Sequence, residues 1–287
     1  MIIDSHLHLW DLDEFDLPWV NGFEALNKTF SLEMYQSDFK SVDRAIYVEV
    51  DVIENQKDKE IEAIGQLCRD PNSPLVAMVA SLDVCRSDIT SYLQRVHSDA
   101  KHVVGFRQVL HTEERPQGYC LQESFVKGVQ EIGNAGFSFD VCIRPQELED
   151  AAALIKQCPD TYFVIDHGGI PAIASYLEDE KAYEKWKQDI ASIAAMPNSV
   201  CKVSGLVTQA GDLSKSEGLL GEVIAYLKTA FGAERLLFGS DWPVVALVES
   251  AQEWHQRLNT MVSNWTEEER QHLFYKTAQR SYLSRLR

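Results

Sequence analysis

Met1-Ile2-Ile3-Asp4-Ser5-His6-Leu7-His8-Leu9-Trp10 begins the chain, and the rest of the sequence is organised around this stretch. Its short apolar run indicates a buried strand that ends in a His-x-His motif. Because side chains alternate between the two faces of a strand, His6 and His8 point the same way, while Leu7 points into packing. Two such imidazoles can hold a divalent metal ion or polarise a carbonyl group, or they can be two structural histidines.

The alternation of a short apolar run with an amphipathic segment recurs along the chain. After a long first loop at residues 11–35, further strands are expected at 44–50, 75–80, 103–107, 137–143, 162–165, 200–204 and 235–239, and helices at 57–69, 88–97, 121–134, 146–157, 183–195, 219–231, 249–261 and 266–280. Strands that alternate with helices imply a parallel sheet, so the pattern predicts a (β/α)₈ TIM barrel, a single domain spanning residues 1–287. A doubly wound open sheet is the main alternative, but the first strand is not followed by a Gly-rich phosphate loop.

Composition narrows the choice of partners. The formal net charge of −17 argues against nucleic acid and anionic membranes. No apolar run approaches the roughly 18 residues of a membrane span, and the N-terminus lacks the pattern of an export signal. The six cysteines form no Cys-x-x-Cys pair, which favours buried free thiols in a reducing compartment. We therefore expect a cytoplasmic protein that acts on a small molecule.

Polar residues collect where the predicted strands end, which is where TIM barrels carry their chemistry. In chain order these residues are His6, His8, Glu49, Arg107, Arg144, His167, Ser204 and Asp241. Each has a structural alternative: Arg107 can be a salt-bridge partner, Asp241 a helix N-cap, and Glu49 a solvated edge residue. Three histidines and one carboxylate at the ends of the first, sixth and eighth strands nevertheless favour a common reaction centre.

Six motifs carry a resemblance to a known family. They are Asp4-Ser-His-Leu-His-Leu-Trp10, Gly105-Phe-Arg107, Phe139-Asp-Val-Cys-Ile-Arg-Pro145, Val164-Ile-Asp-His-Gly168, Cys201-Lys-Val-Ser-Gly205 and Leu237-Phe-Gly-Ser-Asp-Trp-Pro243. Together they resemble the amidohydrolase superfamily, in the branch of sugar-lactone hydrolases and pyrone-dicarboxylate lactonase. Carried over by position, the resemblance implies that His6, His8, His167 and Asp241 form the reaction centre, with Arg107 near the substrate.

The sequence departs from the superfamily pattern in two places. Metal-dependent members usually add a histidine on the fifth strand, and binuclear members a bridging Lys or Glu on the fourth. Here the fifth strand has no histidine and the fourth ends in Arg107-Gln108, which argues against a binuclear site. In addition, His167 is followed by Gly168-Gly169-Ile170-Pro171, where relatives often carry a Lys before the Pro.

The expected reaction is hydrolysis of a sugar-derived lactone, such as a fucono-, rhamnono- or galactonolactone, to its hydroxy acid. Asp241 is expected to act as general base on water, and the imidazoles of His6, His8 and His167 to polarise the carbonyl. The residues expected to contact the substrate are Arg107, Glu49, Trp10, Trp242 and Arg144, with Trp19 as a further candidate for the pocket wall. For Arg144, however, a structural ion pair with Asp140 or Glu147 is the favoured alternative.

The four reaction-centre residues also offer nitrogen and oxygen ligands. His6, His8, His167 and Asp241 are therefore candidate ligands for one divalent ion, zinc being the best match, in a reaction that does not strictly require it. Two other functions stay open. One is a metal-dependent decarboxylase or amide hydrolase on the same barrel, and the other is an inactive barrel that binds a sugar acid.

Overall fold

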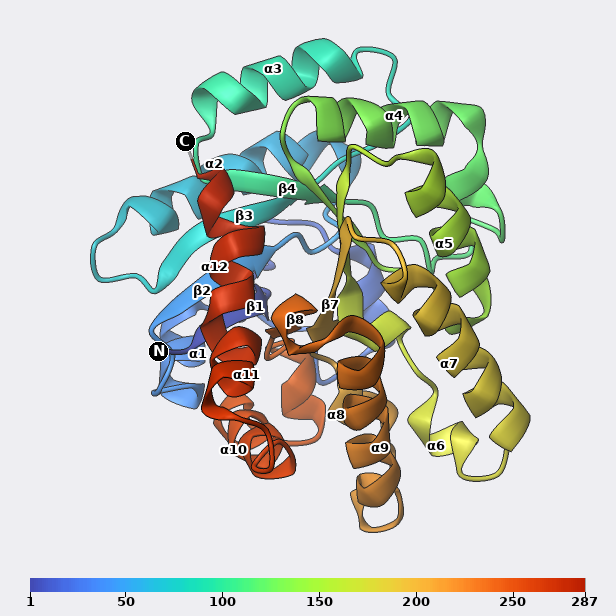
Figure 1. Ribbon diagram of the computed structural model, residues 1–287. Coiled ribbons are helices and arrows are strands. Elements are labelled where there is room, and N and C mark those ends of the chain that lie inside the picture. Colours follow the sequence, from blue (N-terminus) through green and yellow to red (C-terminus); the bar gives the residue numbers. More distant parts are fainter. Residues whose placement is uncertain (287) are drawn as a thin grey trace.

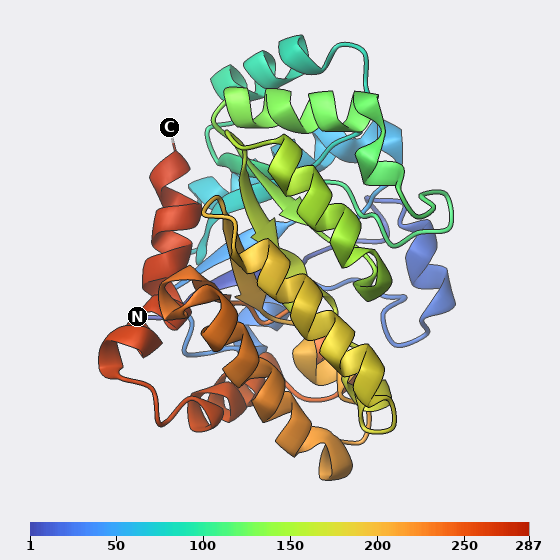
Figure 2. The ribbon, with the colours of Figure 1, turned by 45° about the vertical axis from the view of Figure 1, so that its right-hand side comes forward.

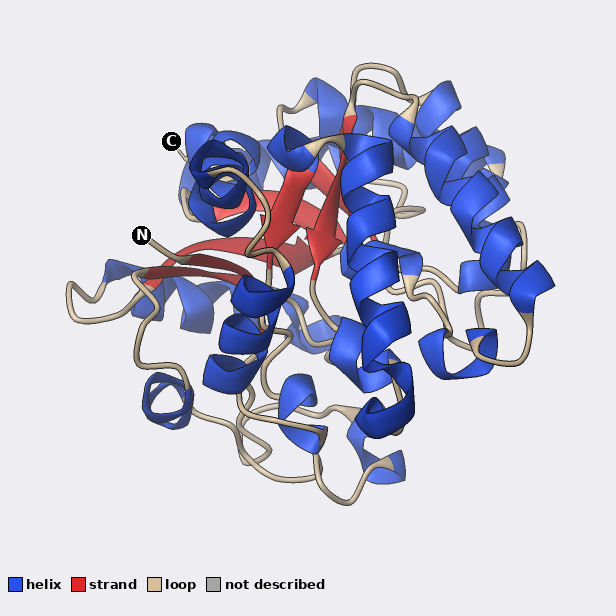
Figure 3. Ribbon diagram, turned by 60° about the horizontal axis from the view of Figure 1, so that its bottom comes forward, coloured by secondary structure: helices blue, strands red, loops and turns tan. Residues whose placement is uncertain are grey.

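Eight parallel strands form the centre of the computed structural model, which describes residues 1–286. Each strand hydrogen-bonds to the next along the chain, in the order β1 to β8 (Figures 1 and 3). The strands are β1 (Ile3–Leu7), β2 (Arg44–Val48), β3 (Leu75–Ser81), β4 (Val103–Arg107), β5 (Ser138–Val141), β6 (Tyr162–Ile165), β7 (Ser199–Val203) and β8 (Leu236–Phe238). The predicted (β/α)₈ barrel is confirmed.

A parallel bridge between Leu7 and Trp242 and a buried carboxylate join β1 to β8. Oδ1 of Asp4 accepts a hydrogen bond of 2.8 Å from the backbone N–H of Ser240, and Oδ2 accepts one of 2.8 Å from the hydroxyl of Tyr35. A buried carboxylate is tolerated only when such donors replace water. Asp4 therefore holds the first strand against the segment that follows the last one.

Helices surround the barrel on all sides (Figure 2). They are α1 (Leu32–Asp38), α2 (Lys57–Arg69), α3 (Ile89–Asp99), α4 (Glu123–Asn134), α5 (Leu148–Gln157), α6 (Ile173–Tyr176), α7 (Glu180–Ala194), α8 (Leu206–Gln209), α9 (Leu213–Phe231), α10 (Ala251–Met261), α11 (Glu267–Gln271) and α12 (Thr277–Ser281). Amphipathic spacing explains how they pack: α7, for example, buries Trp186, Ile190 and Ile193 on one face. Among the described residues, no helix is long and apolar enough to cross a membrane.

The structure differs from the sequence prediction in four segments. The expected first loop, 11–35, contains a 3₁₀ helix at Pro18–Gly22 and the start of α1. The expected helix at 266–280 is interrupted by a π-helical turn at His272–Lys276. Helices α6 and α8 were not predicted because four residues are too few to display a helical period.

All six cysteines are free thiols. Cys120, Cys142, Cys158 and Cys201 are buried, whereas Cys68 and Cys85 are partly exposed. The expected pattern of free thiols is therefore confirmed, and burial holds for four of the six.

Candidate active site

A cavity of about 610 Å³ opens at the carboxyl ends of the strands. Its wall combines polar residues from the strand ends with aromatic and apolar residues from the loops. The lining includes His8, Trp19, Phe23, Glu49, Val50, Asp51, Arg107, His111, Cys142, Arg144, His167, Gly205 and Asp241.

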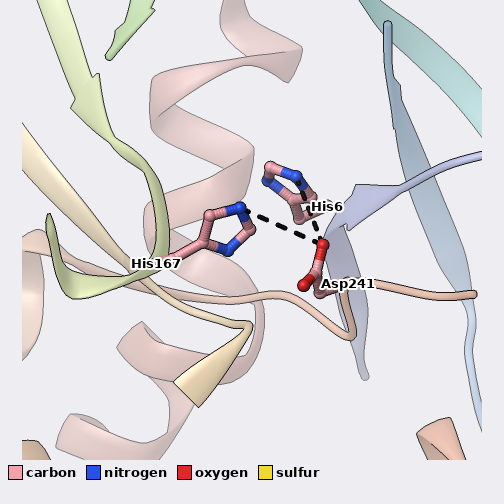
Figure 4. Close-up of side chains that lie close together, drawn as sticks. All are labelled: His6, His167 and Asp241. Atoms are coloured by element: carbon pink, nitrogen blue, oxygen red, sulfur yellow. Dashed lines mark ion pairs between the residues drawn. The ribbon is translucent and has the colours of Figure 1, made fainter. Parts of the chain in front are cut away.

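The four predicted reaction-centre residues lie together around one carboxylate oxygen. Asp241 Oδ1 is 3.7 Å from His6 Nε2, 3.6 Å from His8 Nε2 and 4.0 Å from His167 Nε2. Figure 4 shows His6 and His167 pointing toward Asp241. Asp241 does not cap a helix, because the 3₁₀ helix Val244–Leu247 has Pro243 at its N-cap and no side chain bonded there.

The side chains of His167 and Asp241 are oriented by left-handed backbone conformations. His167 has φ of 54° and Asp241 has φ of 61°, values that few residues other than glycine adopt. Gly205, with φ of 62°, lies between them. A β-carbon on Gly205 would be 2.6 Å from His167 Nδ1 and 2.9 Å from Asp241 Oδ2. The site therefore concentrates backbone strain and needs a glycine at this position.

Hydrogen bonds set the protonation of His6 and His8 at the end of β1. The buried Lys202 ammonium donates to His6 Nδ1 over 3.0 Å, and His8 Nδ1 donates to the carbonyl of Val48 over 2.8 Å. The proton of a neutral His6 is then on Nε2, where it can donate to the lone pair of His8 Nε2, 3.1 Å away. Arg107 Nη1 reaches the same His6 nitrogen only at 3.5 Å.

Electrostatics keep the imidazoles of His6 and His167 neutral. Burial and the Lys202 charge hold the pKa of His6 well below 6.5. Burial also lowers the pKa of His167, whose Nδ1 is 3.0 Å from the hydroxyl of Ser204. Neutral imidazoles carry both an N–H donor and a lone pair, so they can either donate to an oxyanion or bind a metal ion.

Beside the histidines, five buried charged residues form what we call the ionic layer: Glu49, Arg107, Asp166, Lys202 and Asp140. Arg107 donates to Glu49 Oε1 over 2.6 Å and to Asp166 Oδ2 over 3.1 Å. Lys202 Nζ contacts Asp166 Oδ1 at 2.9 Å and Asp140 Oδ2 at 2.6 Å. Opposite charges therefore alternate along the layer, and Lys202 also holds His6.

Sequence reasoning missed three members of the ionic layer, Asp140, Asp166 and Lys202. The available signal was a charged residue inside an otherwise apolar strand, or directly after one, since such a charge must find a partner in the interior. It also missed His111 and Asp51, which lie in loops and line the cavity.

Of the residues predicted to contact the substrate, some line the cavity and others do not. Arg107 and Glu49 line the cavity but bond to each other, and Arg144 lines it while pairing with Glu147 at 2.8 Å. Trp10 and Trp242, each 3% exposed, pack against Phe30 and are not among the lining residues.

Trp19 does line the cavity. Which aromatic residue of a long loop faces a cavity depends on how the loop folds back, and residue spacing does not encode that.

The reaction centre has the dimensions of a mononuclear metal site. His6 Nε2 is 3.7 Å and His167 Nε2 is 4.0 Å from Asp241 Oδ1, and the ligand atoms of these three residues all lie within 4.8 Å of one another. Metal–ligand bonds of about 2.0–2.2 Å in a tetrahedral site put ligand atoms roughly 3.3–3.6 Å apart. His6, His167 and Asp241 thus fit one divalent ion, whereas the predicted fourth ligand, His8, does not belong to this group.

A second group, Cys142, Asp166 and His167, also has ligand atoms within 4.8 Å of one another. It fits an ion less well. Burial raises the pKa of the Cys142 thiol, which disfavours the thiolate, and Arg107 and Lys202 already pair with Asp166.

Comparison with known proteins places these observations in context. A family model described as Amidohydrolase matches residues 3–283. An L-fucono-1,5-lactonase from Burkholderia multivorans is 28% identical over 98% of this chain and 95% of its own length. An L-rhamnono-gamma-lactonase from Scheffersomyces stipitis is 23% identical, with 98% of each chain covered. A crystal structure of an amidohydrolase from Burkholderia multivorans with bound zinc superposes with a TM-score of 0.86 at 26% identity, covering 99% of each chain.

Proposed function

The chain belongs to the amidohydrolase family, and from this premise we propose that it is a lactonase that hydrolyses a neutral, sugar-derived lactone to its hydroxy acid. The full-length similarity to a fuconolactonase and a rhamnonolactonase supports the reaction class. The cluster of Asp241 with the imidazoles of His6, His8 and His167 supplies the chemistry that ester hydrolysis needs: a base for water and an N–H donor for an oxyanion.

The charge of the cavity wall carries the proposal. Its two arginines, Arg107 and Arg144, already bond to the protein: Arg107 to Glu49 and Asp166, and Arg144 to Glu147. Further Arg144 donors reach the carbonyls of Leu110, Thr112 and Arg115.

Among the lining residues that the structure describes, no Lys or Arg therefore lacks a protein partner. A substrate carboxylate would lose water without gaining a free cation, whereas a neutral lactone has no such cost. This favours a sugar lactone over the carboxylate substrates of a decarboxylase.

In the proposed mechanism, Asp241 removes a proton from a water molecule as the water attacks the lactone carbonyl. His167, whose Nδ1 bonds to Ser204 and whose Nε2 faces Asp241, provides the N–H donor that stabilises the oxyanion that forms. The tetrahedral intermediate then expels the ring oxygen, which takes the proton from Asp241. The hydroxy acid that results has one acidic group more than the substrate, so turnover releases a proton to the solution.

A divalent ion held by His6, His167 and Asp241 would add Lewis-acid stabilisation of the oxyanion when bound. We propose that the ion is not strictly required. Lys202, His6, His8 and the carbonyl of Val48 form a consistent chain of hydrogen bonds without an ion. To ligate an ion through Nε2, His6 must instead carry its proton on Nδ1, which is 3.4 Å from Asp166 Oδ1.

The test is a pH-stat screen of aldonolactones of both ring sizes, with gas and amine analysis of the products. The proposal expects acid release alone, abolished in Asp241→Asn. Carbon dioxide from an aromatic acid, or amine from an amide, with no acid from any lactone would establish the alternative enzyme classes. Binding of a sugar acid without turnover of any substrate would establish the inactive barrel.

A further inference from the structure

Asp51 is a cavity residue to which the mechanism gives no role. It follows β2 by three residues, lines the cavity and has φ of 52°. Its backbone N–H donates to Glu49 Oε2 over 2.7 Å. Its carboxylate, by contrast, forms no hydrogen bond or ion pair with any group in the described part of the chain. The nearby residues Glu49 and Arg107 pair with each other instead.

Burial and the neighbouring negative charge of Glu49 raise the pKa of Asp51. The charges of Arg115, Lys57 and Arg107 act in the opposite direction, but none of these cations bonds to the Asp51 carboxylate, and burial decides the direction of the shift. A carboxylate with two free oxygens accepts hydrogen bonds and donates none, so a ligand that relieves it must bring donors.

An aromatic surface lies next to this carboxylate. The indole Nε1 of Trp19 donates to the carbonyl of Val50 over 2.8 Å, which fixes the ring beside the residue that precedes Asp51. Phe23 packs edge-on against Trp19 with ring centroids 6.3 Å apart, and both rings line the cavity. The loops after β1 and β2 thus build one wall, while His167 and Asp241 lie in the segments that follow β6 and β8.

We propose that Asp51 and Trp19 form a subsite that recognises the hydroxyl groups of the lactone ring. The Asp51 carboxylate accepts hydrogen bonds from ring hydroxyls, and the Trp19 ring covers the apolar C–H face of the sugar. The subsite rests on the proposed lactonase function and deepens it, because it makes the enzyme selective for polyhydroxylated lactones over unsubstituted ones.

The experiment compares kcat/KM for the best aldonolactone with kcat/KM for δ-valerolactone, which has no hydroxyl groups. Asp51→Asn suits the test because Asn keeps the shape of the side chain and tolerates positive φ. We expect the ratio of the two values to fall about 10- to 100-fold, the range for losing a hydrogen bond to a charged group. Most of the change should come from the KM of the aldonolactone.

Two further variants complete the design. Glu62→Gln removes one negative charge from an exposed position on α2, and it should leave the ratio unchanged. Trp19→Leu should lower the ratio in the same direction as Asp51→Asn, and it replaces that variant in the test if Asp51→Asn does not fold.

An unchanged ratio in Asp51→Asn, or in Trp19→Leu where it stands in, overturns the subsite and leaves the lactonase function intact. If the unmodified enzyme hydrolyses no lactone, the proposed function fails and the subsite fails with it. The two failures are therefore distinguishable.

Discussion

The ionic layer, of which Glu49 and Arg107 also line the cavity, and the acidic residues Asp51 and Asp241 of the cavity wall differ in whether their charges are paired with opposite charges. In the ionic layer, Lys202 contacts Asp140, Asp166 and His6, and Arg107 contacts Glu49 and Asp166. On the cavity wall, the Asp51 carboxylate has no hydrogen-bonding partner in the described chain, and the Asp241 carboxylate contacts only imidazoles, at 3.6–4.0 Å.

The contrast separates two uses of charge. Charges held in ion pairs fix the positions and tautomers of neighbouring groups, and charges that have no ionic partner are left to act on a ligand. A search for charged residues alone would treat both regions as equivalent. Each prediction below tests whether this division of roles is real.

The largest effect is expected on the cavity wall. Asp241→Asn should lower kcat by ~10²–10⁴-fold, the usual cost of losing a general base, with little change in thermal stability. The pairing of near-native melting with lost turnover is the informative result. Substantial remaining activity would return Asp241 to a structural role.

In the ionic layer, the same kind of change should affect stability. Lys202→Met leaves Asp140 and Asp166 buried without their ammonium partner, and breaking a buried pair in this way costs about 3–5 kcal/mol. Urea-induced unfolding measures the loss.

The matched control is Lys185→Met, because Lys185 also bridges two carboxylates, Glu149 and Asp189, but is half exposed. Exposed ion pairs contribute at most about 1 kcal/mol. Equal losses in the two variants would mean that burial of the layer does not matter.

The sequence predicted these two regions unequally. The barrel was predicted from apolar strand segments that alternate with amphipathic helical segments. The convergence of His6, His8, His167 and Asp241 was predicted from their positions at strand ends. Both predictions used only local sequence pattern. The ionic layer depends on pairing between strands far apart in sequence, such as Lys202 on β7 with Asp140 on β5, and one sequence does not encode such pairs.

Loop residues were the least predictable. Trp10, Trp19 and Trp242 were indistinguishable as wall candidates, yet only Trp19 lines the cavity. The same holds for Asp51, whose role depends on a backbone conformation that spacing does not reveal.

Glu60 sharpens the comparison because it is a buried carboxyl beside the ionic layer with no cation of its own. Oε1 accepts from Tyr47 and from the backbone of Val50, whereas Oε2 is buried without a partner. Burial and the charge of Glu49 raise the pKa of Glu60 to about 8, so the folded protein holds this proton at neutral pH.

The sign of the pH dependence follows. A folded-state pKa above the unfolded value stabilises the fold below the unfolded pKa, near 4.5, and this contribution is lost as the pH rises through 8. Glu60→Gln imitates the protonated form and should therefore gain stability relative to the unmodified protein as the pH rises from about 4.5 to about 8, and the gain should level off above pH 8. Between these two pKa values the gain grows by about 1.4 kcal/mol for each pH unit. Glu62→Gln, on the exposed side of α2, should show no such trend, and a flat difference for Glu60→Gln would mean that its carboxyl is ionised at neutral pH.

The smallest effect is expected from removing metal ions. The histidines at the reaction centre already have protein partners, and a lactone is an activated ester whose leaving group stays tethered, so it needs less Lewis-acid help than an amide. Exhaustive chelation, with metal content measured in parallel on a mock-treated sample, should therefore leave most of the lactonase activity. If turnover vanishes and one added equivalent of zinc restores it, the ion is catalytic. The imidazoles would then belong with the ionic layer as groups that position another charge, and the division between the two regions would have to be redrawn.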